Sequence, residues 1–566
     1  MQHSKFNILF LIITFVLPSL AQIPAFPGAE GFGASTTGGR GGRVIYVSNL
    51  NPDGPGSLQA ALNETGKRYI LFKVSGIIPA TMEVLPGHGD FTLAGQTSPR
   101  GVIVRGFQSY AEENPSSGNF IIRHIRSRIG DLNVYPSSSW IGADGLTLGG
   151  VHKAIIDHCS FAHASDEAVD ISRSSSLTIQ NSLLAETLGG HSDLGGMLIN
   201  YSSSNSRMDS LSIHHNTWHR IGGRMPEISC ETQYCGGQTI KLEISNNLFW
   251  DPQIEMWYEG VTGQPGASFN LQMNALNNFS FARPGYGNGM FHIDLLYPQN
   301  NSLFFNGNQL NLYPNYSDYD LFYCCNDFPD NNPNHQTGAA QIRNERWPYP
   351  SIGYTAVEEL TQYMADHVGA FPRDAMDIRL TSSLRNETID PSSINEDHYS
   401  DAFTIVDEIA GTIDSDNDGM PDYWETRKGL NPNVADHNGT DLSVEVTGVS
   451  GYTNLECYLN CLSDYLVSGE SSSPCAVAVS TKTDEKKSNE IQIFPNPGYE
   501  TISIQMPDIH SPFALSIFDN MGRRILHRQC TSEVEQLEIS HLAPGIYSIL
   551  LTNHNTTYSQ CWVKAR

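Results

Sequence analysis

Residues 211–218 read LSIHHNTW, and this stretch decides the fold because its pattern recurs along the chain. Three neighbouring segments repeat an Ile followed five residues later by a large apolar residue: AIIDHCSF (154–161), LTIQNSLL (177–184) and LEISNNLF (242–249). An Asn also recurs at the bend: Asn181, Asn216, Asn247 and Asn278, the last three 31 residues apart. A repeat of roughly 20 to 35 residues without helical periodicity predicts a parallel β-helix, in which each coil stacks apolar residues inward and Asn amides can form a ladder.

Short apolar, β-branched runs broken by Asn, Gly and Ser continue this pattern over about residues 43–308, for example at residues 44–47 and 69–74. Such runs predict strands. A β-sandwich is the alternative, but it predicts no recurring residue at the turns. Beyond residue 308 we expect loops and a capping segment, with a helical patch near residues 357–367.

The chain of 566 residues carries a formal net charge of -27. Because phosphate binding needs clustered Lys and Arg, this charge argues against nucleic acid and anionic membranes as partners. An acidic partner would need a bridging cation, and Ca²⁺ suits that role because it prefers carboxylate and carbonyl oxygens. After the N-terminus, no segment is long and apolar enough to span a bilayer.

The ten cysteines are too sparse to form the framework of the fold. We expect a buried free thiol at Cys159. The expected local disulfides are Cys230–Cys235, Cys457–Cys461 and Cys530–Cys561.

A calcium-binding loop is predicted at residues 414–425, which read DSDNDGMPDYWE. They match the pattern D-x-[DN]-x-[DN]-G-x₅-E at every specified position, with Gly419 where the loop must bend and a Glu placed to close the site. The expected ligands of this structural Ca²⁺ are Asp414, Asp416, Asp418, Asp422 and Glu425.

In a series of motifs between residue 26 and about residue 250, the chain resembles the pectate lyases of polysaccharide lyase family 1. The similar segments are FPGAEGFG (26–33), GPGSL (54–58), AGQTSP (94–99), IIR (121–123), DGLT (144–147), IDHCS (156–160), DEAVDI (166–171) and residues 214–226, with PRDAMD (372–377) further on. The resemblance implies a right-handed parallel β-helix that binds Ca²⁺ and polygalacturonate. On the matching positions, it implies that Asp144, Asp166 and Asp170 are Ca²⁺ ligands and that Arg224 is the catalytic base.

The implied chemistry is physically reasonable. The proton at C5 of a uronate is barely acidic, so a site must neutralise the adjacent carboxylate as negative charge develops, which a bound cation can do. Arg is an unusual base because a free guanidinium has a pKa above about 12. Burial and a nearby cation both disfavour its protonated form.

The chain departs from the family pattern at positions that usually contact the substrate. Glu227 stands where Arg is usual in Arg-x-Pro-Arg, and Ser229 occupies a further basic position. His191 is a candidate substrate-binding residue, but Ser192 follows it where the family often has Lys. The substrate is therefore either polygalacturonate itself, methylated pectin or another uronate polymer.

The last segment resembles the sorting domain of type IX secretion in FPNP (494–497), LSIFD (515–519) and LAPGIY (542–547). The resemblance implies passage through the secretion machinery and release from the cell or attachment to its outer surface. A small carbohydrate-binding β-sandwich is the alternative for this segment.

The sequence thus predicts an all-β protein with five parts. These are an export signal at 1–21, a parallel β-helix lyase domain with its loops and cap at 22–410, a Ca²⁺-binding module at 411–463, a linker at 464–488 and a sorting β-sandwich at 489–566. The N-terminal part is assigned from its cationic start, apolar core and small-residue end. We expect a secreted monomer that cleaves polygalacturonate by Ca²⁺-dependent β-elimination to unsaturated oligogalacturonides. The rival functions are a non-catalytic pectin-binding β-helix and a hydrolase.

Overall fold

The structure is a computed structural model. It describes residues 23–110, 117–130, 143–187, 195–200, 202–230, 232–259, 269–324, 328–329, 340–391, 401–410, 412–470, 475, 492–494, 501–505, 513–518, 524–530, 534–542, 545–552 and 557–564. The predicted export signal and His191 lie outside these ranges. The chain divides into two compact units, Met1–Val477 and Ala478–Arg566.

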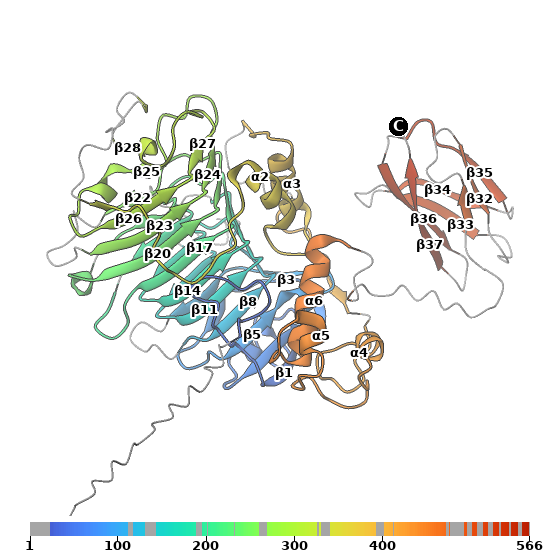
Figure 1. Cartoon of the computed structure of the whole chain (residues 1–566). Coiled ribbons are helices and arrows are strands. Elements are labelled where there is room, and N and C mark those ends of the chain that lie inside the picture. Colours follow the sequence, from blue (N-terminus) through green and yellow to red (C-terminus); the bar gives the residue numbers. More distant parts are fainter. Residues whose placement is uncertain are drawn as a thin grey trace, which may run out of the picture. The chain divides into compact units, whose positions relative to one another are not determined.

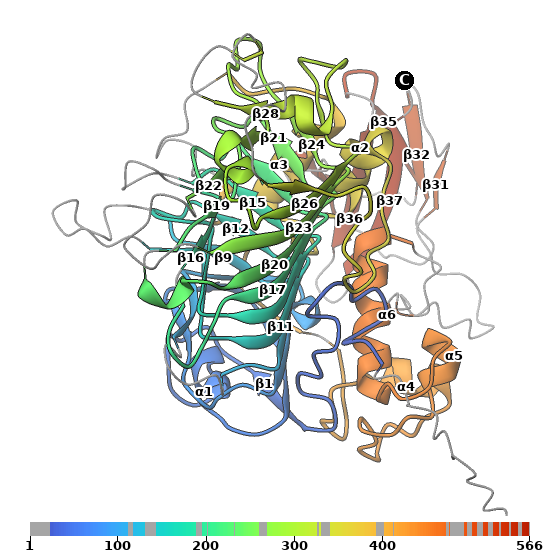
Figure 2. The same ribbon diagram turned by 60° about the vertical axis from the view of Figure 1, so that its left-hand side comes forward.

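The first unit is a parallel β-helix built on three long sheets, and the predicted fold class is confirmed (Figures 1 and 2). The first sheet contains β1(Arg43–Val47), β2(Arg68–Phe72), β5(Phe91–Ala94), β8(Phe120–Arg123), β11(His152–Asp157), β14(Ser175–Gln180), β17(Asp209–His214), β20(Thr239–Ser245), β23(Asn270–Leu276), β26(Ser302–Asn306) and β29(Gln341–Ile342). The second sheet contains β3(Val74–Ile78), β6(Val102–Val104), β9(Arg126–Arg128), β12(Ser160–Ala162), β15(Leu183–Ala185), β18(Thr217–His219), β21(Leu248–Trp250), β24(Phe279–Phe281), β27(Gln309–Leu310) and the antiparallel β30(Glu408–Ile409). The third sheet contains β4(Met82–Val84), β7(Phe107–Tyr110), β10(Leu146–Gly149), β13(Val169–Ser172), β16(Met197–Asn200), β19(Glu227–Ile228) and β22(Trp257–Tyr258).

Short elements surround these sheets. The helices are α1(Leu58–Leu62), α2(Val357–His367), α3(Ala375–Arg385), α4(Asp422–Lys428), α5(Ser443–Thr447) and α6(Asn454–Ser468), and the 3-10 turns are Gly95–Thr97, Gln233–Cys235, Ile293–Leu296 and Asp318–Leu321. A small pair, β25(Phe291–His292) and β28(Phe322–Tyr323), follows the third sheet. The helix expected near residues 357–367 is confirmed. Within the described ranges, no helix combines the length and apolar character needed to cross a bilayer.

The repeat predicted from the sequence becomes a stack inside the β-helix. Ile156, Ile179, Ile213 and Ile244 occupy matching positions of neighbouring strands in the first sheet, and all four are buried. Asn216, Asn247 and Asn278 form the expected ladder, which extends to Asn308 through side-chain hydrogen bonds of 3.2, 3.1 and 2.8 Å.

Asn181 does not belong to this ladder, so that part of the prediction is wrong. Ser182 takes the ladder position, and its backbone N–H donates to the Asn216 side chain at 2.9 Å. Asn181 lies one residue earlier, in the left-handed backbone conformation with φ 50°. Asn tolerates that conformation better than most residues, which explains why an Asn stands at either of the two neighbouring turn positions.

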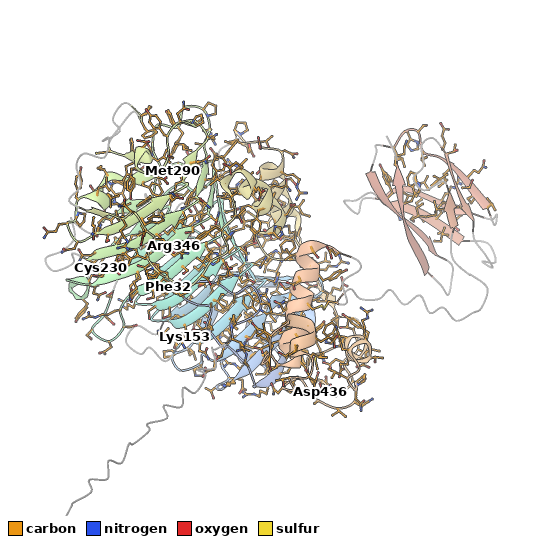
Figure 3. The ribbon with its side chains drawn as sticks, in the orientation of Figure 1. Phe32, Lys153, Cys230, Met290, Arg346 and Asp436 are labelled. Carbon is orange, nitrogen blue, oxygen red and sulfur yellow. A yellow bond between two sulfur atoms is a disulfide. The ribbon has the colours of Figure 1, made fainter. Side chains whose placement is uncertain are left out.

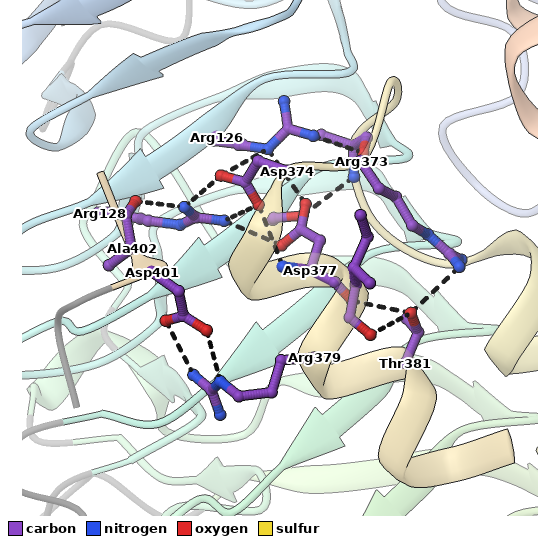
Figure 4. Close-up of polar contacts among 12 residues, drawn as sticks. Arg126, Arg128, Arg373, Asp374, Asp377, Arg379, Thr381, Asp401 and Ala402 are labelled. Atoms are coloured by element: carbon purple, nitrogen blue, oxygen red, sulfur yellow. Dashed lines mark hydrogen bonds and ion pairs between the residues drawn. The ribbon is translucent and has the colours of Figure 1, made fainter. Parts of the chain in front are cut away.

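Buried ion pairs fix α3 against the second sheet (Figure 4). Arg126 and Arg128 of β9 are fully buried, and Arg128 contacts Asp374 at 2.5 Å and Asp377 at 2.9 Å. Asp374 also caps α3 by accepting from the Asp377 backbone N–H at 3.0 Å. Because breaking one partner of such a network leaves an uncompensated buried charge, the 372–377 motif serves the fold.

The segment from residue 412 to residue 470 packs on the outer face of the first strands. Its Met420, Trp424 and Leu455 share a hydrophobic cluster with Tyr69 and Leu71 of β2. Figures 1 and 2 show α6 lying beside this end of the first sheet. The predicted calcium-binding segment is therefore part of the first compact unit.

The cysteine predictions hold in part. Cys230 and Cys235 form the expected disulfide, and Cys159 is a buried free thiol. The Cys457–Cys461 pair is wrong because Cys461 bonds to Cys475, while Cys457 remains free in the hydrophobic cluster beside β2. Cys530 is also free, so its predicted pairing is wrong.

The second unit contains two antiparallel sheets, as predicted for a small β-sandwich. One contains β31(Gln492–Phe494), β32(Thr501–Gln505) and β35(Val534–Glu538), and the other contains β33(Phe513–Phe518), β34(Arg524–Cys530), β36(Gly545–Thr552) and β37(Thr557–Lys564). Residues of both sheets, among them Ile502, Ile504, Leu515, Ile549 and Trp562, share one buried core.

Candidate functional site

An acidic group lies on the third sheet, where two neighbouring strands present carboxylates side by side. Asp144 lies two residues before β10, and Asp170 is the second residue of β13. The two strands are paired so that Thr147 faces Asp170. One carboxylate oxygen from each of Asp144, Glu167 and Asp170 lies within 4.8 Å of the other two.

Glu167 is the member of this group that sequence reasoning missed. The resemblance implied Asp166, whose Oδ1 instead lies 4.0 Å from Arg224 Nη1. The charge of Asp166 nevertheless raises the pKa of both Asp144 and Asp170, so it lies close to the group. The dipeptide at 166–167 precedes a strand, and its sequence does not indicate which carboxylate points toward Asp170.

The electrostatics of the acidic group favour a bound cation. Burial raises the pKa of Asp144 to about 7, and burial together with the charge of Asp144 raises the pKa of Asp170 to about 8. Asp144 accepts hydrogen bonds from the Thr147 hydroxyl at 2.7 Å and from the Glu167 backbone N–H at 3.2 Å. The raised pKa values show that the negative charges of these carboxylates are unfavourable when no cation is bound. A hard divalent cation such as Ca²⁺ would stabilise them.

Arg224 lies directly beside the acidic group. Its guanidinium contacts Glu167, and its Nε donates to Glu227 Oε2 at 3.0 Å. The Arg224 side chain is only 15% exposed. Gly195 allows this close packing, because a Cβ there would lie 2.2 Å from the Cβ of Arg224. The structure therefore brings Arg224 to the carboxylates, as the resemblance implied, and Glu227 occupies the position of the usual second Arg.

A second acidic group lies in the segment that packs on β1 and β2. Ligand atoms of Asp414, Asp416 and Asp418 come within 4.8 Å of one another, and so do those of Asp418, Glu425 and Asp436. Figure 3 labels Asp436, which sequence reasoning missed because it lies beyond the loop motif.

Glu425 is the clearest indication that this second group holds an ion. The residue is 0% exposed, and neither of its carboxylate oxygens has a hydrogen-bond partner among the described residues. Burial and the surrounding carboxylates raise its pKa to about 8. An unpartnered buried carboxylate is costly unless a cation compensates it.

Asp422 is not among the residues that meet in this group. Its carboxylate accepts from the Ser415 backbone N–H at 2.8 Å and from the Ser415 hydroxyl at 2.7 Å. Asp414 also accepts from the Tyr46 hydroxyl, and Lys73 Nζ donates to Asn417 at 3.0 Å. The loop is thereby attached to residues in and beside β1 and β2 of the β-helix.

Several proteins resemble this chain over most of its length. It is 29% identical over 461 residues to "Probable pectate lyase C" of Emericella nidulans, covering 78% of this chain and 94% of that protein. It is also 29% identical over 460 residues to "Probable pectate lyase C" of Aspergillus flavus, with the same coverage. "Pectate lyase 1" of Cryptomeria japonica is 30% identical over 188 residues, which cover 29% of this chain and 48% of that protein.

Two solved structures with more distant sequences also match. A Bacillus subtilis pectate lyase mutant matches with a TM-score of 0.40 and 15% identity, covering 62% of this chain and 98% of that one. Jun a 1, the major allergen from cedar pollen, matches with a TM-score of 0.38 and 16% identity, covering 60% of this chain and 92% of that one.

The C-terminal unit matches a separate family. Residues 492–565 match the family described as "Secretion system C-terminal sorting domain". The protein is thus extracellular or attached to the outer surface. Over its β-helix the chain is a homologue of the pectate lyases, and it carries a secretion sorting domain at its C-terminal end.

Proposed function

We propose that this protein is a secreted pectate lyase that cleaves polygalacturonate by Ca²⁺-dependent β-elimination and leaves the cell by type IX secretion. The proposal rests on one observation: carboxylate oxygens of Asp144, Glu167 and Asp170 lie within 4.8 Å of one another, and Arg224 contacts Glu167. The similarity to pectate lyases over 78% of the chain supports the same reaction class.

In the proposed reaction, Arg224 accepts the proton from C5 of a uronate, and the electron pair of the C5–H bond forms a C4=C5 double bond. The C4–O4 bond breaks, and O4 leaves with the departing chain and takes a proton from water. Asp144, Glu167 and Asp170, with Asp166 at their edge, would hold Ca²⁺, which when bound would neutralise the carboxylate of the sugar that loses its proton. Glu227 orients the guanidinium through its hydrogen bond to Nε. Glu167 contacts Arg224 and belongs to the acidic group, so its carboxylate links the two parts of the site.

Product analysis tests this proposal directly. Polygalacturonate incubated with the full-length protein and Ca²⁺ should yield a product with the ultraviolet absorbance of a conjugated unsaturated uronate, and a chelator should stop its formation. A hydrolase would keep working in chelator and leave saturated ends. A non-catalytic binding protein would give no product. Methylated pectin and other uronans in the same screen identify the polymer that is used.

The calcium requirement should fall as the pH rises from about 6 to about 8. Asp144 and Asp170, with pKa values raised to about 7 and about 8, hold protons at the lower pH, and a cation must displace them. We therefore expect the Ca²⁺ concentration that gives half-maximal turnover to decrease by more than about ten-fold across this range and to level off above it. Calcium titrations of turnover at several pH values measure this concentration. A half-maximal Ca²⁺ concentration that does not change with pH would contradict Asp144 and Asp170 as ligands.

We further propose that Asp414, Asp416, Asp418, Glu425 and Asp436 hold a structural Ca²⁺ that ties residues 414–436 to the first strands of the β-helix. Supporting this are the unpartnered Glu425 carboxylate and the contacts of the loop with Tyr46 and Lys73.

Removing this structural ion should lower the thermal stability of the first unit. A ligand at about 100 times its dissociation constant contributes about 2.7 kcal/mol, which corresponds to a shift of roughly 5 °C in a domain of this class. We expect Glu425→Gln to lose most of the Ca²⁺-dependent increase in Tm, measured by calorimetry with and without chelator. Asp441→Asn removes an exposed carboxylate of the same segment, and this matched control should keep the Ca²⁺-dependent increase in Tm. If Glu425→Gln showed the same Ca²⁺-dependent increase in Tm as the wild type, the proposed structural Ca²⁺ site would be contradicted.

A further inference from the structure

A row of outward-facing side chains runs across the third sheet and contains Asp170. Strand register aligns Thr147 with Asp170, Asp170 with Leu198, Leu198 with Glu227 and Glu227 with Trp257. The residues between them along each strand, such as Val169 and Ile171, are buried in the core. We call Glu83, Gln108, Thr147, Asp170, Leu198, Glu227 and Trp257 the outer row.

Trp257 ends the outer row as a half-buried indole with aromatic support. Its ring stacks on His292 of β25, with centroids 3.9 Å apart and planes 28° from parallel. His292 is itself buried, and burial lowers its pKa, so the imidazole is neutral at neutral pH. The indole is thereby held by a rigid aromatic neighbour at the surface of the sheet. Since neighbouring strands are about 4.8 Å apart, it lies roughly 14 Å along the row from Asp170.

The charges along the outer row differ from those expected for a surface that binds a polyanion. None of its seven described positions is Lys or Arg, and three of them, Glu83, Asp170 and Glu227, are acidic. Glu227 is the direct strand neighbour of Trp257, and Asp294 lies 3.5 Å from His292. Arg224 offsets the charge of Glu227, but none of the seven positions of the outer row offers a free uronate carboxylate a cationic partner at this end.

We propose that Trp257 is a stacking platform for an uncharged sugar of the substrate, such as a methyl-esterified galacturonate, bound about three strands from the acidic group. This proposal rests on the proposed function and deepens it, because it assigns the free carboxylate to the acidic group and the esterified sugar to Trp257. An indole face covers the C–H groups of a pyranose without requiring a charge. The substrate class it selects is partly methyl-esterified polygalacturonate.

The test compares kinetics on two polymers that differ only in esterification. For Trp257→Ala in the full-length protein, we expect KM on partly methyl-esterified polygalacturonate to rise about ten-fold, because the sugar loses its aromatic contact and the apolar area that it buries against the indole. The effect should fall on KM rather than on kcat, and it should be several-fold smaller on fully de-esterified polymer. Trp257→Phe should recover most of the loss. Tyr297→Ala, at an aromatic residue that is 41% exposed and outside the row, is the control and should change neither constant.

The outcomes separate this proposal from the function on which it rests. An unchanged KM in Trp257→Ala, or an equal loss on both polymers, overturns the platform while leaving the lyase in place. If the wild-type protein forms no unsaturated product from any uronan, the proposed function fails instead. In that case, calorimetry measures the affinity of the same two polymers for the wild type and for Trp257→Ala. Equal affinities for the partly esterified polymer would overturn the role of Trp257.

Discussion

Replacing Arg224 with Lys is expected to reduce turnover of polygalacturonate by about 10³-fold, within the range that a positioned base contributes. The guanidinium contacts Glu167 and donates to Glu227 from Nε, and a Lys ammonium cannot reproduce both contacts in the same plane. The initial rate of ultraviolet-absorbing product at saturating Ca²⁺ and substrate measures the loss.

The fold should remain intact in this variant, because Lys keeps a positive charge beside Glu167 and Glu227. Circular dichroism and the Tm check this. Arg207→Lys, at an exposed Arg, is the matched control and should retain wild-type turnover. Wild-type turnover by Arg224→Lys would rule out Arg224 as the base.

Replacing Asp170 with Ala should raise the Ca²⁺ concentration needed for half-maximal turnover by at least about 10²-fold. Loss of residues that merely orient metal ligands already costs 10- to 100-fold in metal affinity, and Asp170 is proposed as a ligand itself. It is also one of the three carboxylates whose oxygens meet within 4.8 Å. Calcium titration of turnover provides the measurement.

A comparison with Asp53→Ala, in an exposed loop, controls for a general change in net charge. Excess Ca²⁺ should restore part of the activity of Asp170→Ala, because Asp144 and Glu167 remain. A half-maximal Ca²⁺ concentration equal to that of the wild type would exclude Asp170 from the site.

The sequence predicted the coil of the β-helix well because one physical requirement repeats. Each coil must bury its apolar residues against the next, so the spacing from Ile213 to Trp218 returns in the neighbouring coils. The turn is harder to predict, since an Asn suits both the ladder and the left-handed position before it. The sequence therefore predicts Asn181 in the ladder, although Ser182 occupies that position.

The candidate sites could be predicted only for residues that belong to a sequence motif. Asp144, Asp170 and Arg224 lie close together as the motifs indicated. Whether Asp166 or Glu167 joins them depends on the backbone conformation just before β13, which the sequence does not reveal. Asp436 joins Glu425 only because the chain after α4 folds back. The assignments of Asp166, Asp422 and His191 remain predictions.

The pairing of Trp257 with His292 has no counterpart in local sequence. The two residues lie on successive coils, and only the register of β13, β16, β19 and β22 brings the indole into line with Asp170. Contacts of this kind follow from the stacking of coils and not from any single strand.

The most direct test of the central claim is the rate of unsaturated product formation from polygalacturonate at controlled free Ca²⁺ in the Glu425→Gln variant, where the proposed structural ion no longer contributes. The rate is expected to rise to saturation with Ca²⁺ and to fall to background in chelator. Product formation that continues undiminished in chelator would contradict a cation held by Asp144, Glu167 and Asp170 beside Arg224.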